Sequence, residues 1–359
     1  MNALEGRIKA LIAAQGPISV AQYMTLALHD AEGGYYATRE PFGIAGDFIT
    51  APEISQMFGE MLGLWCVQVW HDQGQPKQKR LVELGPGCGT LMADALRAAK
   101  AAPEFLLGLE VVLIESSPVL QKAQAEKLKD CGVTIRWANH FDNSMTDRPL
   151  LLLANEFFDA LPVRQYIKTE RGWHERMIVA KNESLDFALA PAPVPGALIP
   201  GSRATAPDGG AYEASPASTA LAETIARVIA EKGGGALLLD YGYGEEAGFG
   251  ETLQAVGGHK FADVLAEPGE NDLSAHVDFA ALGDAAQHGG AAVYGPTPQG
   301  AFLAELGITA RAEQLINANP GAAQNLLQAI ARLIGPDQMG NLFKAMAFLP
   351  RSAARPPGF

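Results

Sequence analysis

The stretch LVELGPGCGTL, residues 81–91, decides the fold of this chain. Its apolar start is typical of a buried strand, its end opens a helical pattern, and three glycines lie between them. Gly85 permits a tight turn, Gly87 lets the backbone approach a ligand closely, and Gly89 allows the helix to pack near the strand. The order strand, glycine loop, helix predicts an α/β domain with a ligand at the loop, although some α/β proteins use such turns only structurally.

The spacing of the glycines indicates which ligand to expect. A dinucleotide-binding loop has the pattern G-x-G-x-x-G, which requires glycine at position 90, where this chain has Thr90. The loop instead suits an adenosine with a short zwitterionic tail. The next strand ends in Glu115, whose carboxylate can accept both ribose hydroxyls, and the strand after it precedes Phe141 and Asp142, which can stack on and hydrogen-bond adenine. These features favour S-adenosylmethionine over NAD; the alternative for Glu115 is a local cap of the following helix.

Apolar runs and helical segments alternate from residue 80 onward. The expected strands are RLVELG (80–85), LEVVLIES (109–116), VTIRWA (133–138), LLLLANEFF (150–158) and GGALLLDYG (234–242). Continuous apolar strands between helices are typical of a parallel sheet covered on both faces, so we expect a doubly wound, Rossmann-like α/β sheet. VRQYIK, WHERMIVA and LDFALA, between the fourth and fifth strands, read as an antiparallel meander and predict an inserted lobe.

The same patterns predict a division of the chain. We expect N-terminal helices and a cofactor-covering loop in residues 1–75, and the Rossmann-like core in 76–162 and 230–300. The inserted substrate lobe is expected in 163–229, and a C-terminal segment in 301–359 completes the core.

The composition limits the classes of function. The chain has 359 residues and a net charge of −13, and so acidic a protein repels phosphate backbones, which argues against general nucleic-acid binding. Its three cysteines form no C-x-x-C pair, and its histidines lack the spacing of metal ligands. Neither a signal-peptide pattern nor an apolar run of about 18 to 20 residues occurs. We therefore expect a cytoplasmic protein with no metal and no membrane insertion.

Three polar residues follow the fourth strand. Asn155, Glu156 and Asp159 come at the carboxyl end of a buried strand, the edge at which open α/β sheets bind ligands. Glu156 and Asp159 are three residues apart and can share one face of a helical turn, where two carboxylates can bind a guanidinium bidentately. That placement directs the third guanidinium nitrogen at a transferable methyl group. The alternative is that Asn155 caps a helix whose dipole the two acids complement.

Other candidates rest on weaker patterns. His276 and Asp278 in LSAHVDF can form a proton relay beside the acceptor, although a histidine in an alternating strand is more often structural. Tyr35, Tyr36 and Phe48 are surrounded by glycines, and we expect them to cover the cofactor as a lid rather than to lie in the core. The end of the fifth strand supplies candidate acceptor contacts: Asp240, Tyr241 and Tyr243.

Ten short segments together resemble one known family. They are PISVAQYM (17–24), GGYY (33–36), GDFITAPEIS (46–55), FGE (58–60), ELGPGCGTLMADAL (83–96), NEFFDALPV (155–163), LDYGY (239–243), TLQAVGGHKF (252–261), DLSAHVDF (272–279) and FKAM (343–346). As a set, over about residues 17–347, they are similar to the MidA-like family of methyltransferases, which includes the mitochondrial complex I assembly arginine methyltransferase. Ser274 stands where we expect threonine in that pattern.

The resemblance implies a seven-stranded class I methyltransferase fold with an inserted lobe and S-adenosyl-L-methionine as cofactor. It also implies symmetric dimethylation of an arginine on the 49-kDa-type subunit of respiratory NADH dehydrogenase. In this hypothesis Glu156 and Asp159 bind the guanidinium, and His276 helps to remove its proton. The cofactor site comprises Glu83, Gly85, Gly87, Gly89, Glu115, Ser116, Phe141, Asp142 and Asn155.

The partner expected from this hypothesis is a protein that bears the target arginine, and a homodimer is a further expectation. Two alternatives stay open at this stage. One is a methyltransferase that acts on another protein residue or on a small molecule. The other is an assembly chaperone that binds the cofactor without catalysis. An NAD dehydrogenase is disfavoured by Thr90.

Overall fold

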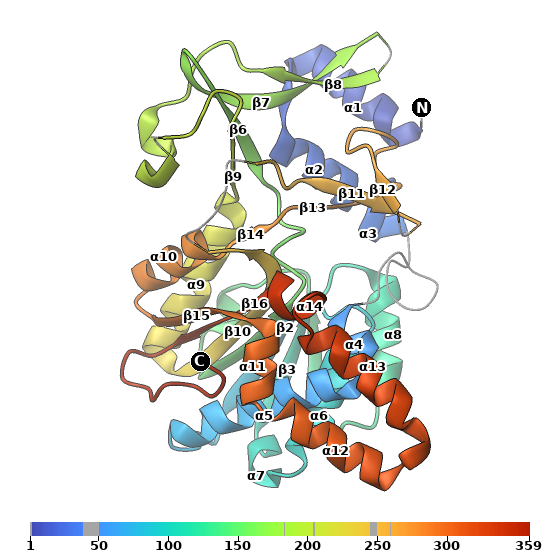
Figure 1. Cartoon of the computed structure of the whole chain (residues 1–359), viewed down its shortest axis with the longest axis vertical. Helices are drawn as coiled ribbons and strands as arrows, with labels where there is room; N and C mark the ends of the chain where they lie inside the picture. The colour runs from blue at the N-terminus through green and yellow to red at the C-terminus, as the bar shows by residue number, and fades with distance from the viewer. Residues whose placement is uncertain (1, 39–49, 183, 204, 245–249, 259) are drawn as a thin grey trace.

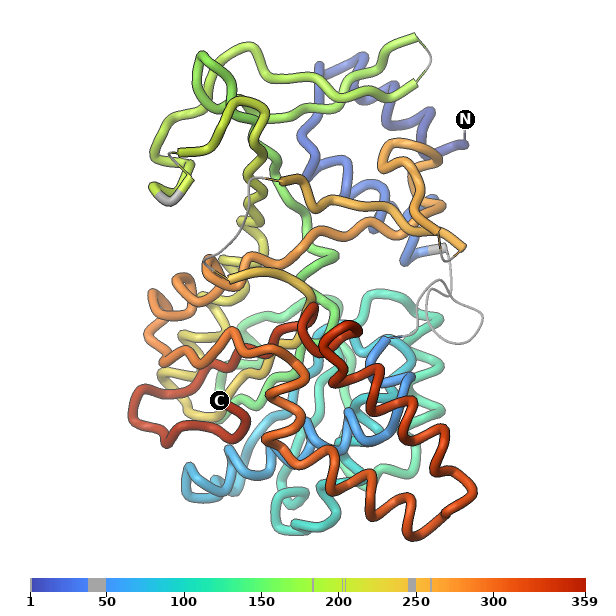
Figure 2. The backbone as a smooth tube through the Cα atoms, viewed as in Figure 1, coloured from blue at the N-terminus to red at the C-terminus, as the bar shows by residue number. Residues whose placement is uncertain are grey.

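A computed structural model gives the fold of the chain and describes residues 2–38, 50–182, 184–203, 205–244, 250–258 and 260–359. It has two parts, one above the other in the view of Figure 1. The lower part is an α/β core. The upper part, here called the covering lobe, is built from the described residues of 2–38, 163–214 and 250–275. The N-terminus lies in the covering lobe and the C-terminus in the core (Figure 2).

The core contains an eight-stranded sheet. Its strands are β2 (Lys79–Leu84), β3 (Leu109–Ile114), β4 (Thr134–Ala138), β5 (Leu150–Asn155), β10 (Gly234–Tyr243), β14 (Val277–Asp278), β15 (Ala292–Pro298) and β16 (Phe343–Leu349). They run in the order β15-β16-β10-β5-β2-β3-β4, and β14 pairs with the end of β10. The neighbours from β10 to β4 are parallel, whereas β16 is antiparallel to β10 and β15. The strand order reverses between β2 and β5, and open α/β sheets bind ligands at such a point.

Both faces of this sheet are buried. Successive residues of β2 face opposite sides, so that Leu81 packs in one apolar cluster and Val82 in another. The first cluster includes residues of α5 (Gln56–Asp72), α6 (Thr90–Ala99), α7 (Pro103–Leu106), α8 (Pro118–Leu128), α11 (Gln299–Glu305), α12 (Ile308–Ala318), α13 (Ala323–Ile334) and α14 (Met339–Leu342). The second includes residues of η1 (Asn143–Met145), α9 (Pro216–Lys232) and α10 (Phe279–His288). The doubly wound sheet predicted from the sequence is confirmed.

The covering lobe has its own apolar cluster, formed by helices packed on two small sheets. α1 (Ala3–Gln15) contributes Leu4 and Ile8, β7 contributes Ile178, and β13 contributes Leu273. Its elements also include β1 (Ile18–Ser19), α2 (Val20–His29), α3 (Tyr35–Thr38), β6 (Arg164–Thr169), β7 (Gly172–Lys181), β8 (Ser184–Leu189), η2 (Gly196–Leu198), η3 (Gly201–Arg203), β9 (Ala211–Ala214), β11 (Gln254–Gly257), β12 (Lys260–Ala262) and β13 (Asp272–Ser274). β6, β7 and β8 are antiparallel neighbours, as the meander pattern predicts.

The division of the chain differs from the expected one at three places. α5 belongs to the core rather than to the N-terminal unit, because its apolar face packs on α6 and the sheet. α9 also belongs to the core, where Ile225 and Ile229 are fully buried. Residues 253–275 join the covering lobe instead, and Figure 2 shows this stretch beside the N-terminal helices.

The lid role expected of Tyr35 is wrong, because its ring is fully buried in the apolar cluster of the covering lobe. The Tyr36 hydroxyl donates to Asp272 Oδ1 at 2.9 Å, and the ring lies close enough to Asp159 for the charge of that carboxylate to raise the Tyr36 pKa. The covering role of Tyr36 therefore stays a prediction. Phe48, the third residue expected in the lid, lies outside the described residues.

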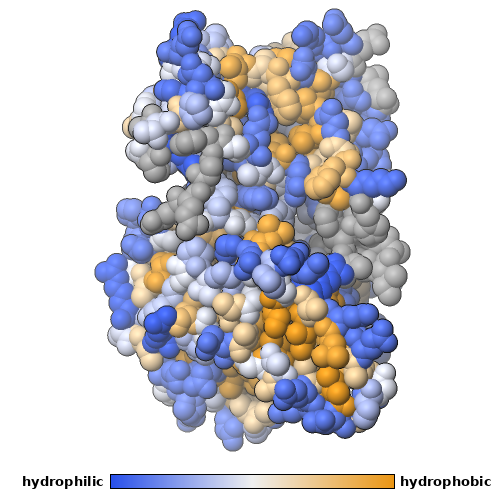
Figure 3. Space-filling view, viewed as in Figure 1, coloured by the Kyte–Doolittle hydropathy of each residue, from blue (hydrophilic) through white to orange (hydrophobic). Residues whose placement is uncertain are grey.

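Apolar side chains also gather on the surface of the core near α13 and α14 (Figure 3). Leu327 of α13 and Leu342 of α14 are each more than half exposed. None of the helices in the described ranges is long and apolar enough to cross a membrane.

Candidate active site

The glycine loop after β2 has a backbone that only glycine adopts readily. Gly85, Gly87 and Gly89 have φ values of +62°, +51° and +77°, in the left-handed region that disfavours other residues. Gly85 is also crowded, because a Cβ there would lie 3.0 Å from the ring of Phe157. Gly89 is the N-cap of α6, whose first backbone N–H groups therefore lie beside the loop.

A pocket lies between this loop and the end of β5. It is lined by Thr50, Pro52, Glu53, Glu83, Gly85, Pro86, Gly87, Cys88, Thr90, Leu91, Asn155 and Glu156. Two buried oxygens at the pocket, Glu83 Oε2 and Asn155 Oδ1, have no hydrogen-bond partner among the described residues. Burial raises the pKa of Glu83 to about 8. Buried acceptors without donors are unfavourable unless a ligand supplies them, and an ammonium group would do so.

The next strand brings Glu115 to the same edge of the sheet. Its Oε1 accepts the backbone N–H of Ser117 at 2.7 Å, and Gln124 Nε2 lies 3.3 Å from its Oε2. Local hydrogen bonding therefore exists, as the capping alternative predicts, and binding of ribose by Glu115 stays a prediction. Gln124 was missed by sequence reasoning, although it is fully buried and also donates to Gly87 O at 2.7 Å. A glutamine at a buried position of α8 was the available signal.

The remaining cofactor residues predicted from the sequence lie at the ends of β3 and β4. Ser116 is exposed at this edge. Asp142 is exposed, and its Oδ1 accepts the backbone N–H of Ser144 at 2.7 Å. Phe141 is half-buried beside the second apolar cluster. Their contact with adenine stays a prediction.

Glu156 and Asp159 lie on a tight turn of residues 156–161 that follows β5. No helix starts there, so the alternative in which both acids complement a helix dipole is wrong. Glu156 has a φ of +50°, which is unusual for a residue other than glycine and is found at positions held by their surroundings. Its backbone N–H donates to Leu239 O at 2.9 Å and so continues the pairing of β5 with β10.

The protein holds the two acids differently. Glu156 Oε1 accepts from the backbone N–H of Ala51 and from Asn155 Nδ2, both at 3.1 Å. Asp159 Oδ1 is buried without a hydrogen-bond partner among the described residues, and the Tyr241 hydroxyl faces this carboxylate closely enough to lower its pKa. Burial raises the pKa of Glu156 to about 7 and that of Asp159 to about 6. The charge on Asp159 further raises the Glu156 pKa, which indicates that the two carboxylates are close.

The contact from Ala51 belongs to a short segment above the loop that sequence reasoning did not place. α4 (Ala51–Ile54) begins after Thr50, and Pro52 in its first turn is the sequence signal for that start. Glu53 of α4 accepts the Thr90 hydroxyl, which in turn accepts from Lys127 Nζ. α4 is thereby joined both to the glycine loop and to Glu156.

The three residues at the end of β10 do different things. Asp240 is 1% exposed and accepts backbone N–H groups of the 156–161 turn. The expectation that Asp240 contacts the methyl acceptor is therefore wrong. The Tyr241 hydroxyl faces the Asp159 carboxylate. The Tyr243 ring lies 6.0 Å from the Arg203 guanidinium, away from the turn.

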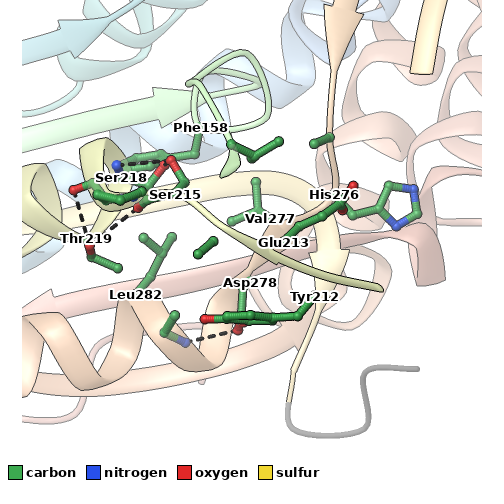
Figure 4. Close-up of a pocket in the computed structure, with 15 residues that line it drawn as sticks. Phe158, Tyr212, Glu213, Ser215, Ser218, Thr219, His276, Val277, Asp278 and Leu282 are labelled. Atoms are coloured by element: carbon green, nitrogen blue, oxygen red, sulfur yellow. Dashed lines mark hydrogen bonds between the residues drawn. The ribbon is translucent and has the colours of Figure 1, made fainter. Parts of the chain in front are cut away.

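His276 does not share the pocket of Glu156. It belongs to a second pocket with Phe158, Tyr212, Glu213, Ser215 and Asp278, and Figure 4 shows its imidazole directed away from the other labelled residues. The imidazole packs edge-on against Tyr241, with ring centroids 5.3 Å apart. His276 and Glu156 therefore line different pockets, and the catalytic role of His276 stays a prediction. Asp278, its expected relay partner, caps α10 instead.

No group of three or more His, Cys, Asp or Glu side chains within the described part of the chain is arranged to hold a metal ion.

Comparisons with known proteins point to one family of methyltransferases. A model of the family described as "Putative S-adenosyl-L-methionine-dependent methyltransferase" matches residues 61–297. The chain is 36% identical to the mitochondrial protein arginine methyltransferase NDUFAF7 of Mus musculus, over 94% of this chain and 82% of the mouse protein. It is also 36% identical to the Homo sapiens protein of the same name, over 94% of this chain and 81% of the human protein. A crystal structure of a Burkholderia thailandensis protein bound to S-adenosyl-homocysteine is 29% identical, with a TM-score of 0.87 over 99% of this chain and 94% of that chain.

Proposed function

Because the chain belongs to this family of S-adenosylmethionine-dependent methyltransferases, we propose that it transfers methyl groups to an arginine side chain of a protein. The observation that carries the proposal is the pair Glu156 and Asp159, held on the turn at the end of β5, where the Asp159 Oδ1 atom has no hydrogen-bond partner among the described residues. The curated relatives support it, because they are named protein arginine methyltransferases.

The residues around the glycine loop fit S-adenosylmethionine. Glu83 Oε2 and Asn155 Oδ1 are acceptors for its ammonium group, Gly85 and Gly87 leave room for its tail, and Glu115 is the acceptor for its ribose. When bound, the cofactor supplies an electrophilic methyl group on a sulfonium. The acidic residues also compensate the positive charge of that sulfonium.

The acceptor side of the proposal follows from charge and geometry. A guanidinium stays protonated in water, and ionised Glu156 and Asp159 can each accept one of its N–H groups. Two anchored nitrogens leave the third directed at the methyl donor, so that positioning supplies part of the rate enhancement. As the third nitrogen gains its methyl group, the cation must lose one proton, and Glu156 or Asp159 is the nearest base.

The finer parts of the proposal come from the family resemblance. We propose symmetric dimethylation, and a 49-kDa-type subunit of respiratory NADH dehydrogenase as the acceptor during assembly of that complex. We also propose that the protein acts in the cytoplasm and that it forms a homodimer.

Transfer of labelled methyl from S-adenosylmethionine into an extract from a strain lacking this gene tests the proposed acceptor and the proposed dimethylated product. The expected product is a single labelled protein that carries symmetric dimethylarginine at one site, identified by mass spectrometry. Label in a small molecule or on another residue type would contradict the arginine proposal. Cofactor binding without any label in the extract would contradict transfer itself and favour an assembly chaperone.

A further inference from the structure

The end of β10 carries two neighbouring polar side chains that both contact the 156–161 turn. Asp240 Oδ2 accepts the backbone N–H groups of Phe157 at 3.2 Å, Phe158 at 2.9 Å and Asp159 at 3.3 Å. Asp240 Oδ1 accepts the backbone N–H of Tyr241 at 2.9 Å. One buried carboxylate therefore satisfies three successive donors of the turn and one donor of its own strand.

Tyr241 contacts the same turn through its side chain. Its hydroxyl faces the Asp159 carboxylate and Ser274, close enough for the hydroxyl to lower the pKa of Asp159. The ring is 9% exposed and is packed edge-on by His276 and by Phe343, at centroid distances of 5.3 Å and 5.6 Å. These two rings hold the hydroxyl beside the Asp159 carboxylate.

We infer that Asp240 and Tyr241 are positioning residues for methyl transfer. Asp240 fixes the backbone of the turn that carries Glu156 and Asp159, and Tyr241 fixes the Asp159 carboxylate. The inference rests on the proposed role of those two acids in binding the acceptor. Neither Asp240 nor Tyr241 lines the pocket at the glycine loop, so both act through the turn and not by contact with the cofactor.

The two acceptor oxygens of Asp240 matter because of the backbone conformation that they hold. The left-handed conformation of Glu156 is unfavourable and persists only where neighbouring groups impose it. An asparagine at position 240 has nearly the same size, but it has one acceptor oxygen instead of two. Either the donors of the turn or the N–H of Tyr241 would then face an amide NH₂ group, and the turn would loosen.

The hydroxyl of Tyr241 has a distinct, measurable effect on Asp159. Donation to a carboxylate favours its ionised form, so loss of the hydroxyl raises the pKa of Asp159. The other groups that face this carboxylate from the packed elements are unchanged by that substitution. They are Glu156 on the same turn, Asp240 on β10, and Tyr36 on α3 with its partner Asp272.

The test compares Asp240→Asn and Tyr241→Phe with Tyr243→Phe, which removes a hydroxyl from the same strand away from the turn. Labelled methyl transfer into the extract described above is measured as a function of pH, and binding of S-adenosylmethionine is measured by calorimetry. We expect both positioning variants to bind the cofactor as the unaltered protein does while losing about tenfold or more in transfer rate. Tyr241→Phe should also move the acid limb of the rate profile to higher pH, whereas Tyr243→Phe should leave rate and profile unchanged.

A second measurement needs no acceptor. Carboxyl carbons of aspartate are labelled with ¹³C, the Asp159 signal is identified by its absence in Asp159→Asn, and its titration is followed by NMR. We expect the midpoint to rise in Tyr241→Phe and to stay in place in Tyr243→Phe. An unmoved midpoint, or wild-type transfer by Asp240→Asn, would overturn the inference. A raised midpoint in a protein that transfers no label would support the hydrogen bond to Asp159 while refuting the proposed function.

Discussion

The backbone N–H of Ala51 donates to Glu156 Oε1 at 3.1 Å, although the two residues are 105 positions apart in the sequence. Ala51 is the first residue of α4, and the N–H groups of a first helical turn have no partner within the helix. Glu156 provides one such partner. A segment above the cofactor loop thus depends on a carboxylate that the proposed reaction also uses, so binding of a cationic acceptor and the position of α4 are linked.

Glu156→Gln should remove methyl transfer and retain the cofactor. The amide keeps the size of the side chain but cannot attract a guanidinium or accept its proton, so we expect a rate loss of about 10²- to 10³-fold. Calorimetry should give nearly unchanged binding of S-adenosylmethionine. Glu126→Gln on the exposed side of α8 is the matched control and should retain full transfer. Equal loss of binding and transfer in Glu156→Gln would contradict the role assigned to this carboxylate.

The rate should fall on the acid side of neutrality. Burial raises the pKa of Glu156 to about 7 and that of Asp159 to about 6, so both are increasingly protonated as the pH falls through that range. Only the ionised forms attract a cationic acceptor. We therefore expect kcat/KM for labelled transfer to decline below about pH 7 by tenfold or more per pH unit. A profile that is flat between about pH 5 and about pH 8 would show that neither acid must be ionised.

Binding of S-adenosylmethionine should release a proton near neutral pH. Burial raises the pKa of Glu83 to about 8, so this carboxyl is mostly protonated at pH 7, and an ammonium group beside it favours the ionised form. Calorimetry in buffers of different ionisation enthalpy measures the number of protons released, which should approach one. Glu83→Gln should abolish the release. Glu126→Gln, on the exposed side of α8 and outside the pocket, is the control and should leave the release unchanged.

Gly63→Ala should destabilise the core without touching the active site. Gly63 lies on α5 where it crosses α6, and an added Cβ would lie 2.5 Å from the Ala95 backbone. Separating two packed helices costs about 1–3 kcal/mol of the free energy of unfolding, which urea denaturation measures. Gly6→Ala on α1 is the control, because no atom lies within 4 Å of its added Cβ. It should stabilise the protein by up to about 1 kcal/mol through helix propensity.

The sequence was sufficient for features that depend on neighbours along the chain. Five strands of the central sheet (β2, β3, β4, β5 and β10), the glycine loop and the position of Glu156 and Asp159 after β5 follow from periodicity and from the rule that ligands bind at the carboxyl edge. The same rule brought Asp240 to this edge. It did not reveal which groups the carboxylate would meet, because that depends on the φ of +50° at Glu156.

Contacts between distant segments were the part that the sequence could not supply. The link between Ala51 and Glu156 joins a loop region to a strand end, and no local pattern marks it. Tyr35 looked like part of a lid because glycines surround it, yet the apolar surface that buries it comes in part from residues 253–275. α5 falls in the region 1–75 expected to form the N-terminal unit, but its packing partner is a sheet that begins later in the chain.

The covering lobe has a consequence for synthesis on the ribosome. The Tyr23 hydroxyl donates to Val264 O at 2.6 Å, and Asn2 Nδ2 donates to Pro268 O at 2.8 Å, across 241 and 266 residues of chain. At about 5–20 residues per second, the first two helices wait on the order of 10–50 s before these partners emerge. The part of their apolar surface that packs on residues 253–275 stays exposed during that interval. A chaperone that holds nascent amphipathic helices would therefore have its longest contact with this end of the polypeptide.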